Sequence, residues 1–149
     1  MIVGVVKETF PGERRVALVP SAVAALKRGD VETVIEAGAG APAGFPDDEY
    51  VEVGARILND RAEVFSAADV LCQVRTIGAN PDHGAADLDL LRSSGDLWVI
   101  GLAEPLSSLD PIKALAETGQ SSFALELIPR ITRAQSMDVL SSQATIAWY

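Results

Sequence analysis

The sequence predicts one α/β domain in three layers, a mainly parallel sheet with flanking helices of the flavodoxin-like or Rossmann-like kind. Short apolar runs of strand length alternate along the chain with segments of helical periodicity, the pattern of strand–helix–strand units. No repeat or linker interrupts this alternation, and 149 residues suit a single domain. Since 48% of the residues are hydrophobic but only 5% are aromatic, we expect a core of small aliphatic side chains.

The first half of the chain contains three expected strands and three expected helices. Pro20 is suited to the first turn of a helix, and Gly29 to its end, with Val23 and Leu26 on the apolar face between them. The expected strands cover residues 2–6, 31–36 and 55–58, and the two further helices cover residues 47–53 and 61–67.

Residues 38–43, GAGAPA, imitate the glycine-rich fingerprint of a dinucleotide site, with Asp60 at about the spacing of its ribose-binding acid. That fingerprint requires a helix to begin at the glycines. Pro42, Gly44 and Pro46 would break such a helix. We therefore interpret the segment as a turn-rich connection, and the domain as one without a glycine-rich dinucleotide loop.

The second half continues the alternation. Strands are expected at residues 70–74, 97–102 and 122–127, and a helix at residues 111–119 with Ile112 and Leu115 facing inward. Residues 76–87 are expected to form a loop, in which His83, the one histidine of the sequence, is solvated. Arg75 is expected at the carboxyl end of its strand, the edge where open α/β sheets bind ligands.

Composition excludes several classes of function. A net charge of −9 argues against nucleic-acid binding, because phosphates would be repelled. Cys72 is the only cysteine, which excludes an internal disulfide and a cysteine-based zinc site; we expect it in the core. No apolar run reaches the ~20 residues of a membrane helix, and the start of the chain lacks a charged signal region, so we expect a cytoplasmic chain.

The polar side chains of the last segment carry most of the functional information. Arg130 offers a planar donor fork, Gln135 can both donate and accept, and Asp138 accepts from an amide or a ribose hydroxyl. They precede an expected helix in which Met137, Leu140, Ala144 and Ala147 recur at helical spacing. The set suits a carboxamide ring and its sugar better than bond cleavage. The alternative is a helix start, with Asp138 favoured by the helix dipole and the arginines in water.

Two long motifs resemble a known family. The stretch PRITRAQSMDVLSSQATIA resembles the signature of the NAD(H)-binding component (alpha subunit, domain I) of proton-translocating NAD(P) transhydrogenase. The opening IVGVVKETFPGERRVALVPSAVAAL resembles the amino terminus that this component shares with alanine dehydrogenases. The likeness covers residues 1–147. It implies that residues 1–149 form the N-terminal domain of the alanine dehydrogenase/transhydrogenase family, an incomplete part of a longer two-domain component.

The resemblance also implies function. In the family, hydride passes directly from NADH to NADP+ and is coupled to proton translocation, with NADP(H) held on a partner component. Arg130, Gln135 and Asp138 would then act at the nicotinamide and its ribose, with Ser141 supporting the loop. The implied partners are the NADP(H)-binding and membrane components and a second copy in a homodimer, which would place the chain peripherally at the inner face of the cell membrane.

Two alternatives remain open from the sequence. In alanine dehydrogenases, an arginine matching Arg15 contacts the substrate carboxylate, a lysine stands where this chain has Arg75, and a catalytic histidine follows the strand that ends near Leu102. Here that position reads GLAEPL, which counts against pyruvate chemistry. The other alternative is a truncated, non-catalytic fragment, since the sequence ends at Trp148 and Tyr149 inside an expected helix.

Overall fold

The structure, a computed structural model, describes residues 1–139, 141 and 143. Its centre is a six-stranded sheet in the order β3-β2-β1-β4-β5-β6, and every neighbouring pair is parallel. The strands are β1 (Ile2–Val5), β2 (Glu32–Glu36), β3 (Arg56–Leu58), β4 (Val70–Arg75), β5 (Trp98–Leu102) and β6 (Ser121–Ala124). The parallel α/β fold expected from the sequence is confirmed.

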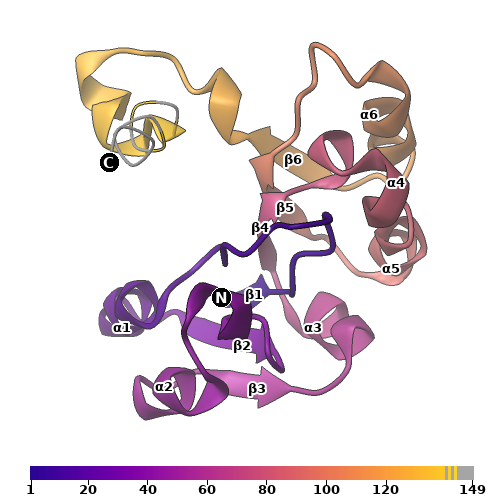
Figure 1. Cartoon of the computed structure of the whole chain (residues 1–149). Helices are drawn as coiled ribbons and strands as arrows, with labels where there is room; N and C mark the ends of the chain where they lie inside the picture. Colours follow the sequence, from indigo (N-terminus) through magenta and orange to yellow (C-terminus); the bar gives the residue numbers. More distant parts are fainter. Residues whose placement is uncertain (140, 142, 144–149) are drawn as a thin grey trace.

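Helices lie on both faces of this sheet (Figure 1). One layer holds α1 (Pro20–Arg28) and α2 (Asp47–Glu52), while the other holds α3 (Arg61–Ala67), α5 (Asp87–Ser93) and α6 (Leu109–Ala116). A short helix, α4 (Pro81–Gly84), follows the 3-10 turn Ile77–Ala79. Among the described residues, no helix is both long and apolar enough to cross a bilayer.

One apolar cluster lies on each face of the sheet, between the strands and the helices. Alternate residues of each strand point to opposite faces, so neighbouring positions enter different clusters. Val34 packs with Phe65 of α3 on one face, whereas Ile35 packs with Val23 of α1 and Tyr50 of α2 on the other. Tyr50 is fully buried, and its hydroxyl donates to the carbonyl of Leu18 at 2.9 Å.

Most expected elements appear within one or two residues of their predicted bounds, but two corrections are needed. The stretch at 76–87 is not a simple loop, because it contains the 3-10 turn and α4 and leads into α5, a helix that the prediction missed. The last strand ends at Ala124 and is followed by the 3-10 turn Leu125–Leu127. The expectation for residues 38–43 is confirmed: no α-helix begins at these glycines, a 3-10 turn, Ala41–Ala43, follows them, and α2 begins only at Asp47.

The segment after Pro129 also differs from expectation. Residues Thr132–Met137 form a 3-10 helix, and Met137 is 53% exposed rather than part of an apolar helix face. Only Ala134 of this segment is buried. Leu140, Ala144 and Ala147, which we expected on the same face, lie outside the described residues.

Candidate functional site

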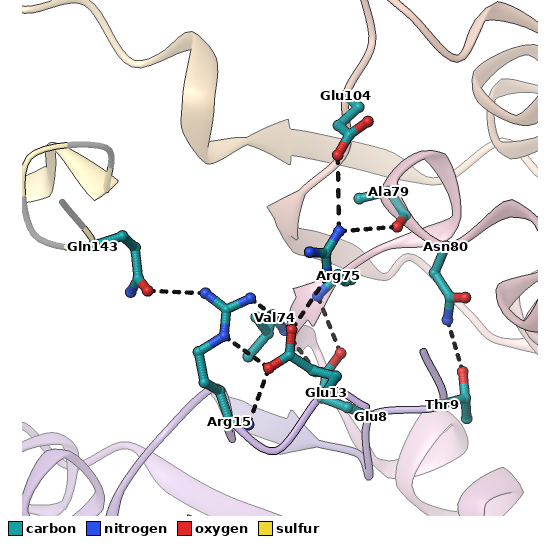
Figure 2. A network of polar contacts seen from close by, with 10 residues as sticks. All are labelled: Glu8, Thr9, Glu13, Arg15, Val74, Arg75, Ala79, Asn80, Glu104 and Gln143. Atoms are coloured by element: carbon teal, nitrogen blue, oxygen red, sulfur yellow. Dashed lines mark hydrogen bonds and ion pairs between the residues drawn. The ribbon is translucent and has the colours of Figure 1, made fainter. Parts of the chain in front are cut away.

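Charged side chains gather where β1 and β4 end (Figure 2). The loop after β1 carries Glu8, Glu13 and Arg15, and β4 ends on Arg75. Because the strands are parallel, their carboxyl ends meet at one edge of the sheet, which is where ligands bind in open α/β folds. We call Glu8, Glu13, Arg15 and Arg75 the strand-end cluster.

The carboxylate of Glu13 lies between two guanidinium groups (Figure 2). Arg15 donates from Nε to Oε1 at 2.7 Å and from Nη2 to Oε2 at 2.6 Å, a bidentate pair. Arg75 donates from Nε to the same Oε2 at 3.2 Å. The Arg15 hydrogen bonds, aided by backbone and charge contacts, lower the pKa of Glu13 to about 2. Glu13 is therefore ionised at neutral pH and holds both arginines in place.

Glu8 fixes the end of β4 from the other side. Its two carboxylate oxygens accept from the backbone N–H groups of Val74 and Arg75, at 2.6 and 3.1 Å. Burial raises the pKa of Glu8 above its usual range, and this effect outweighs the two backbone hydrogen bonds that favour the carboxylate. The negative charge of Glu13 adds to the rise.

The two arginines that follow Glu13 have different surroundings. Arg14 turns away and donates to the carbonyl of Pro42 at 3.2 Å. Arg15 joins the strand-end cluster and also donates from Nη1 to Oε1 of Gln143 at 2.9 Å. Arg15 therefore connects the strand ends to the C-terminal segment, as Figure 2 shows.

The guanidinium of Arg75 is held on several sides. It lies 4.3 Å from the ring centroid of Phe10, and its Nη1 donates to the carbonyl of Ala79 at 3.4 Å. Glu104 approaches the same nitrogen at 3.8 Å. These contacts leave Arg75 three-quarters buried and orient it toward Glu13.

Glu126 fixes the loop that follows β5. Its Oε1 accepts from the backbone N–H of Ala103 at 2.9 Å and from that of Glu104. Glu104 has a left-handed backbone, with φ of 48°, which this anchoring supports. No histidine lies in this loop. Sequence reasoning missed Glu8 and Glu126 because the groups they bind lie 22 to 67 positions away in the chain, and it missed Glu13 as a link to Arg75, which lies 62 positions away.

The predicted site residues of the last segment lie together. Arg130, Gln135 and Asp138 line one polar cavity of about 240 Å³, shared with Ile131 and Thr132. Arg130 Nε lies 3.4 Å from Asp138 Oδ2. The backbone N–H and hydroxyl of Ser141 donate to the two oxygens of Asp138, at 3.2 and 2.6 Å.

This geometry is compatible with both interpretations of the segment, a helix start and a binding site for a carboxamide and its sugar. A carboxylate that accepts from a backbone N–H three residues on is the contact of a helix N-cap. The cavity beside it also presents a guanidinium, an amide and a carboxylate to one small volume, which suits the complementary donors and acceptors of a carboxamide and a ribose. Among the described residues that line the cavity, no two are arranged as a general acid and base. His83, as expected, lies exposed on α4.

Comparisons with known proteins give consistent similarities. The family model described as "Alanine dehydrogenase/PNT, N-terminal domain" matches residues 4–147. The chain is 38% identical over its whole length to NAD(P) transhydrogenase subunit alpha of Cereibacter sphaeroides. It spans only 27% of that relative.

Solved structures agree with this result. A crystal structure of transhydrogenase from Sinorhizobium meliloti matches 99% of the chain at 40% identity, with a TM-score of 0.84, and the match covers 41% of that longer chain. An L-alanine dehydrogenase structure matches 89% of the chain at 26% identity, with a TM-score of 0.77. The match covers 34% of the alanine dehydrogenase chain.

Proposed function

Because the chain belongs to the alanine dehydrogenase/PNT, N-terminal domain family, we propose that it works as the N-terminal part of the NAD(H)-binding component of NAD(P) transhydrogenase. The segment from Arg130 to Ser141 would position the nicotinamide of NADH for direct hydride transfer to NADP+. The similarity to a transhydrogenase alpha subunit, which extends over all 149 residues of this chain, supports this choice within the family.

The cavity lined by Arg130, Gln135 and Asp138 is the observation that carries the proposal. Hydride transfer between two nicotinamide rings requires the rings to be held in register and requires no proton donor or acceptor. The amide of Gln135 can pair with the carboxamide, Asp138 with the carboxamide or a ribose hydroxyl, and Arg130 with the nicotinamide end of the nucleotide. Ser141 orients Asp138 through its two hydrogen bonds.

The chain spans 27% and 41% of the two transhydrogenase relatives. The remaining length would supply the groups that bind adenosine and pyrophosphate, and residues 1–149 alone would be inactive. NADP(H) would be bound by a partner component, with membrane components coupling transfer to proton movement. The chain would act as a homodimer at the cytoplasmic face of the membrane.

The second candidate function is alanine dehydrogenase activity, and the similarity to a solved L-alanine dehydrogenase structure supports it. Pyruvate amination requires a proton to be moved at the substrate, and general acid–base groups supply this. The loop after β5 presents the backbone of Ala103 and Glu104, held by Glu126, and no imidazole. A completed enzyme should therefore give no alanine-dependent reduction of NAD+, and robust turnover with alanine would favour this second function.

The direct test uses residues 1–149 joined to the remainder of the Sinorhizobium meliloti subunit, assembled with its partner components. Gln135→Asn shortens the amide by one methylene, and Asp138→Asn keeps the ability to cap a helix. Each should slow single-turnover hydride transfer by at least about tenfold, because small displacements of a reacting ring are costly. The melting temperature should stay nearly constant.

Ser136→Ala is the matched control. Ser136 lies on the same 3-10 helix but does not line the cavity, so its loss should leave transfer unchanged. Normal transfer in Gln135→Asn and Asp138→Asn, together with a clear fall in melting temperature, would show that the segment is only a helix start.

A further inference from the structure

The segment that lines the candidate cavity buries few of its described side chains. Among the described residues between 130 and 143, Ala134 alone is buried, and Ile131 is 55% exposed. Backbone hydrogen bonds from Ala134 to Ile131 and from Asp138 to Gln135 join residues within the segment. Since burial stabilises a structure roughly in proportion to the apolar area removed from water, it contributes little to holding these residues in place.

A hydrogen bond from Arg15 joins this segment to the beginning of the chain. Arg15 Nη1 donates to Oε1 of Gln143 at 2.9 Å, across 128 positions of sequence (Figure 2). Gln143 follows Ser141 by two positions, and the backbone N–H and hydroxyl of Ser141 donate to the carboxylate of Asp138. Arg15 therefore contacts the segment close to the residues that fix one side of the cavity.

The guanidinium of Arg15 is oriented by Glu13. Its Nε and Nη2 donate to the two oxygens of Glu13, at 2.7 and 2.6 Å. Because a guanidinium is planar, a bidentate pair on one edge fixes the direction of the remaining Nη1 donor. Glu13 also accepts from Arg75 of β4 at 3.2 Å. A continuous series of hydrogen bonds thus runs from the end of β4 to Gln143.

The same contacts decide between two roles for Arg15. An unoccupied arginine fork beside a cavity is suited to an anionic ligand. Here Glu13 occupies the fork, and its carboxylate stays charged at neutral pH because the Arg15 hydrogen bonds lower its pKa to about 2. The geometry therefore favours a role in orienting the protein chain over a role in binding a ligand.

We propose that Arg15 is a positioning residue for hydride transfer, and that its bond to Gln143 holds the segment from Arg130 to Ser141 against the strand-end cluster. This inference rests on the proposed function, because it concerns the segment that would position the nicotinamide. Displacement of a reacting group by ~1 Å can slow a reaction on the order of a hundredfold. Because the described residues of the segment are mostly exposed, one well-oriented hydrogen bond can decide where the segment lies.

The test uses residues 1–149 joined to the remainder of the Sinorhizobium meliloti subunit, assembled with its partner components. Arg15→Lys keeps the positive charge beside Glu13, but an ammonium cannot bind Glu13 bidentately and also reach Gln143. Gln143→Leu removes the acceptor at an exposed position and keeps a side chain of similar size. Each variant should lower the rate constant of single-turnover hydride transfer by about fivefold, the effect of losing one hydrogen bond.

The double variant, Arg15→Lys with Gln143→Leu, measures the coupling between the two side chains. If they act through the bond between them, the second substitution removes nothing further. The double variant should then be about fivefold slower than the wild type, whereas independent effects would make it about twenty-fivefold slower. Arg14→Lys is the matched control, since Arg14 turns toward the carbonyl of Pro42, and it should leave the rate constant unchanged.

Two further measurements separate positioning from a loss of folded protein. Partial unfolding lowers the amplitude of a single turnover, whereas a displaced nicotinamide lowers its rate constant. The Michaelis constant for NADH should change by less than about twofold in Arg15→Lys, because the rest of the subunit would bind adenosine and pyrophosphate. The melting temperature should stay nearly constant.

An unchanged rate constant in either single variant, independent losses in the double variant, or a fall in amplitude alone would overturn this inference. The Gln135→Asn variant separates it from the proposed function. Slow transfer in Gln135→Asn with normal transfer in Arg15→Lys would refute the role of Arg15 only. Normal transfer in both would overturn the proposed function as well.

Discussion

Glu13 and Arg15 form a bidentate ion pair across only one intervening residue, with N···O distances of 2.7 and 2.6 Å. The backbone N–H of Arg15 also donates to Glu13 Oε1, at 3.0 Å. These contacts between residues two positions apart hold the loop after β1 in a compact conformation. The hydrogen bond from Arg75 to Glu13 attaches this loop to β4. The charge of Glu13 is thus central to the order of the strand ends.

Glu13→Gln should make folding stability less dependent on acid. The pKa of Glu13 is lowered to about 2 from 4.5, so its carboxylate stabilises the fold above pH 4.5 and this contribution is lost as the pH falls toward 2. We expect the variant to be about 1–3 kcal/mol less stable at pH 7 and nearly equal to the wild type only at about pH 2 and below. Urea unfolding across this range measures the difference, and Glu52→Gln on α2 removes an exposed carboxylate as control. A constant difference at all pH values would contradict this role.

Arg61 should be a strong stabilising contact between α3, α5 and β2. Its guanidinium binds both oxygens of Asp87 at 2.7 Å and Glu36 at 2.8 Å, with little exposure of any partner. Arg61→Met leaves two largely buried carboxylates without the guanidinium that neutralises them, so we expect a loss of about 3 kcal/mol in the free energy of unfolding.

The exposed pair of Arg92 and Asp89 supplies the comparison for Arg61. Arg92→Met removes an ion pair of similar length, 2.8 Å, in which both side chains are about half exposed or more. It should cost no more than about 0.5 kcal/mol. Equal losses in the two variants would show that burial does not set the strength of the Arg61 contacts.

Gly78 should not tolerate a side chain. A Cβ atom there would lie 1.8 Å from the carbonyl oxygen of Ala103 and 2.8 Å from Ile112 Cδ1. Gly78→Ala must therefore displace the end of β5 or α6, at a cost on the order of 3 kcal/mol. Gly95→Ala, with nothing within 4 Å of the added atom, should be nearly neutral. Thermal unfolding of both variants decides the matter, and a neutral Gly78→Ala would refute the close approach.

The 149-residue chain should bind NADH only weakly, with a dissociation constant in the submillimolar range at best. In helix-based dinucleotide sites the pyrophosphate sits on a glycine-rich helix N-terminus, and the glycines at 38–40 lead into a 3-10 turn instead. Calorimetric titration measures this affinity. Residues 1–149 joined to the remainder of the Sinorhizobium meliloti subunit serve as the positive control. Micromolar binding to the chain alone would mean that the nucleotide site lies elsewhere.

Local sequence signals predicted most helices and strands but could not reveal contacts between residues that are distant in the sequence. Pro20 and Gly29 marked α1 correctly, because proline and glycine act on the backbone next to them. The helix Asp87–Ser93 was missed because Pro81 and Gly84 before it indicated a loop. The site segment was singled out by its residue types, yet the closeness of Arg130 to Asp138 needed the structure. Glu126 gave no signal, because its partners at Ala103 and Glu104 belong to another strand end.

The order of the strands has a consequence for biosynthesis. β1 is made first and lies inside the sheet, then β2 and β3 extend it on one side, and β4, β5 and β6 extend it on the other. Each new strand can pair with one that has already left the ribosome, and none must insert between two partners that have already joined. Since N-terminal units fold first during translation, the sheet can grow outward from β1 in the order in which the ribosome delivers it.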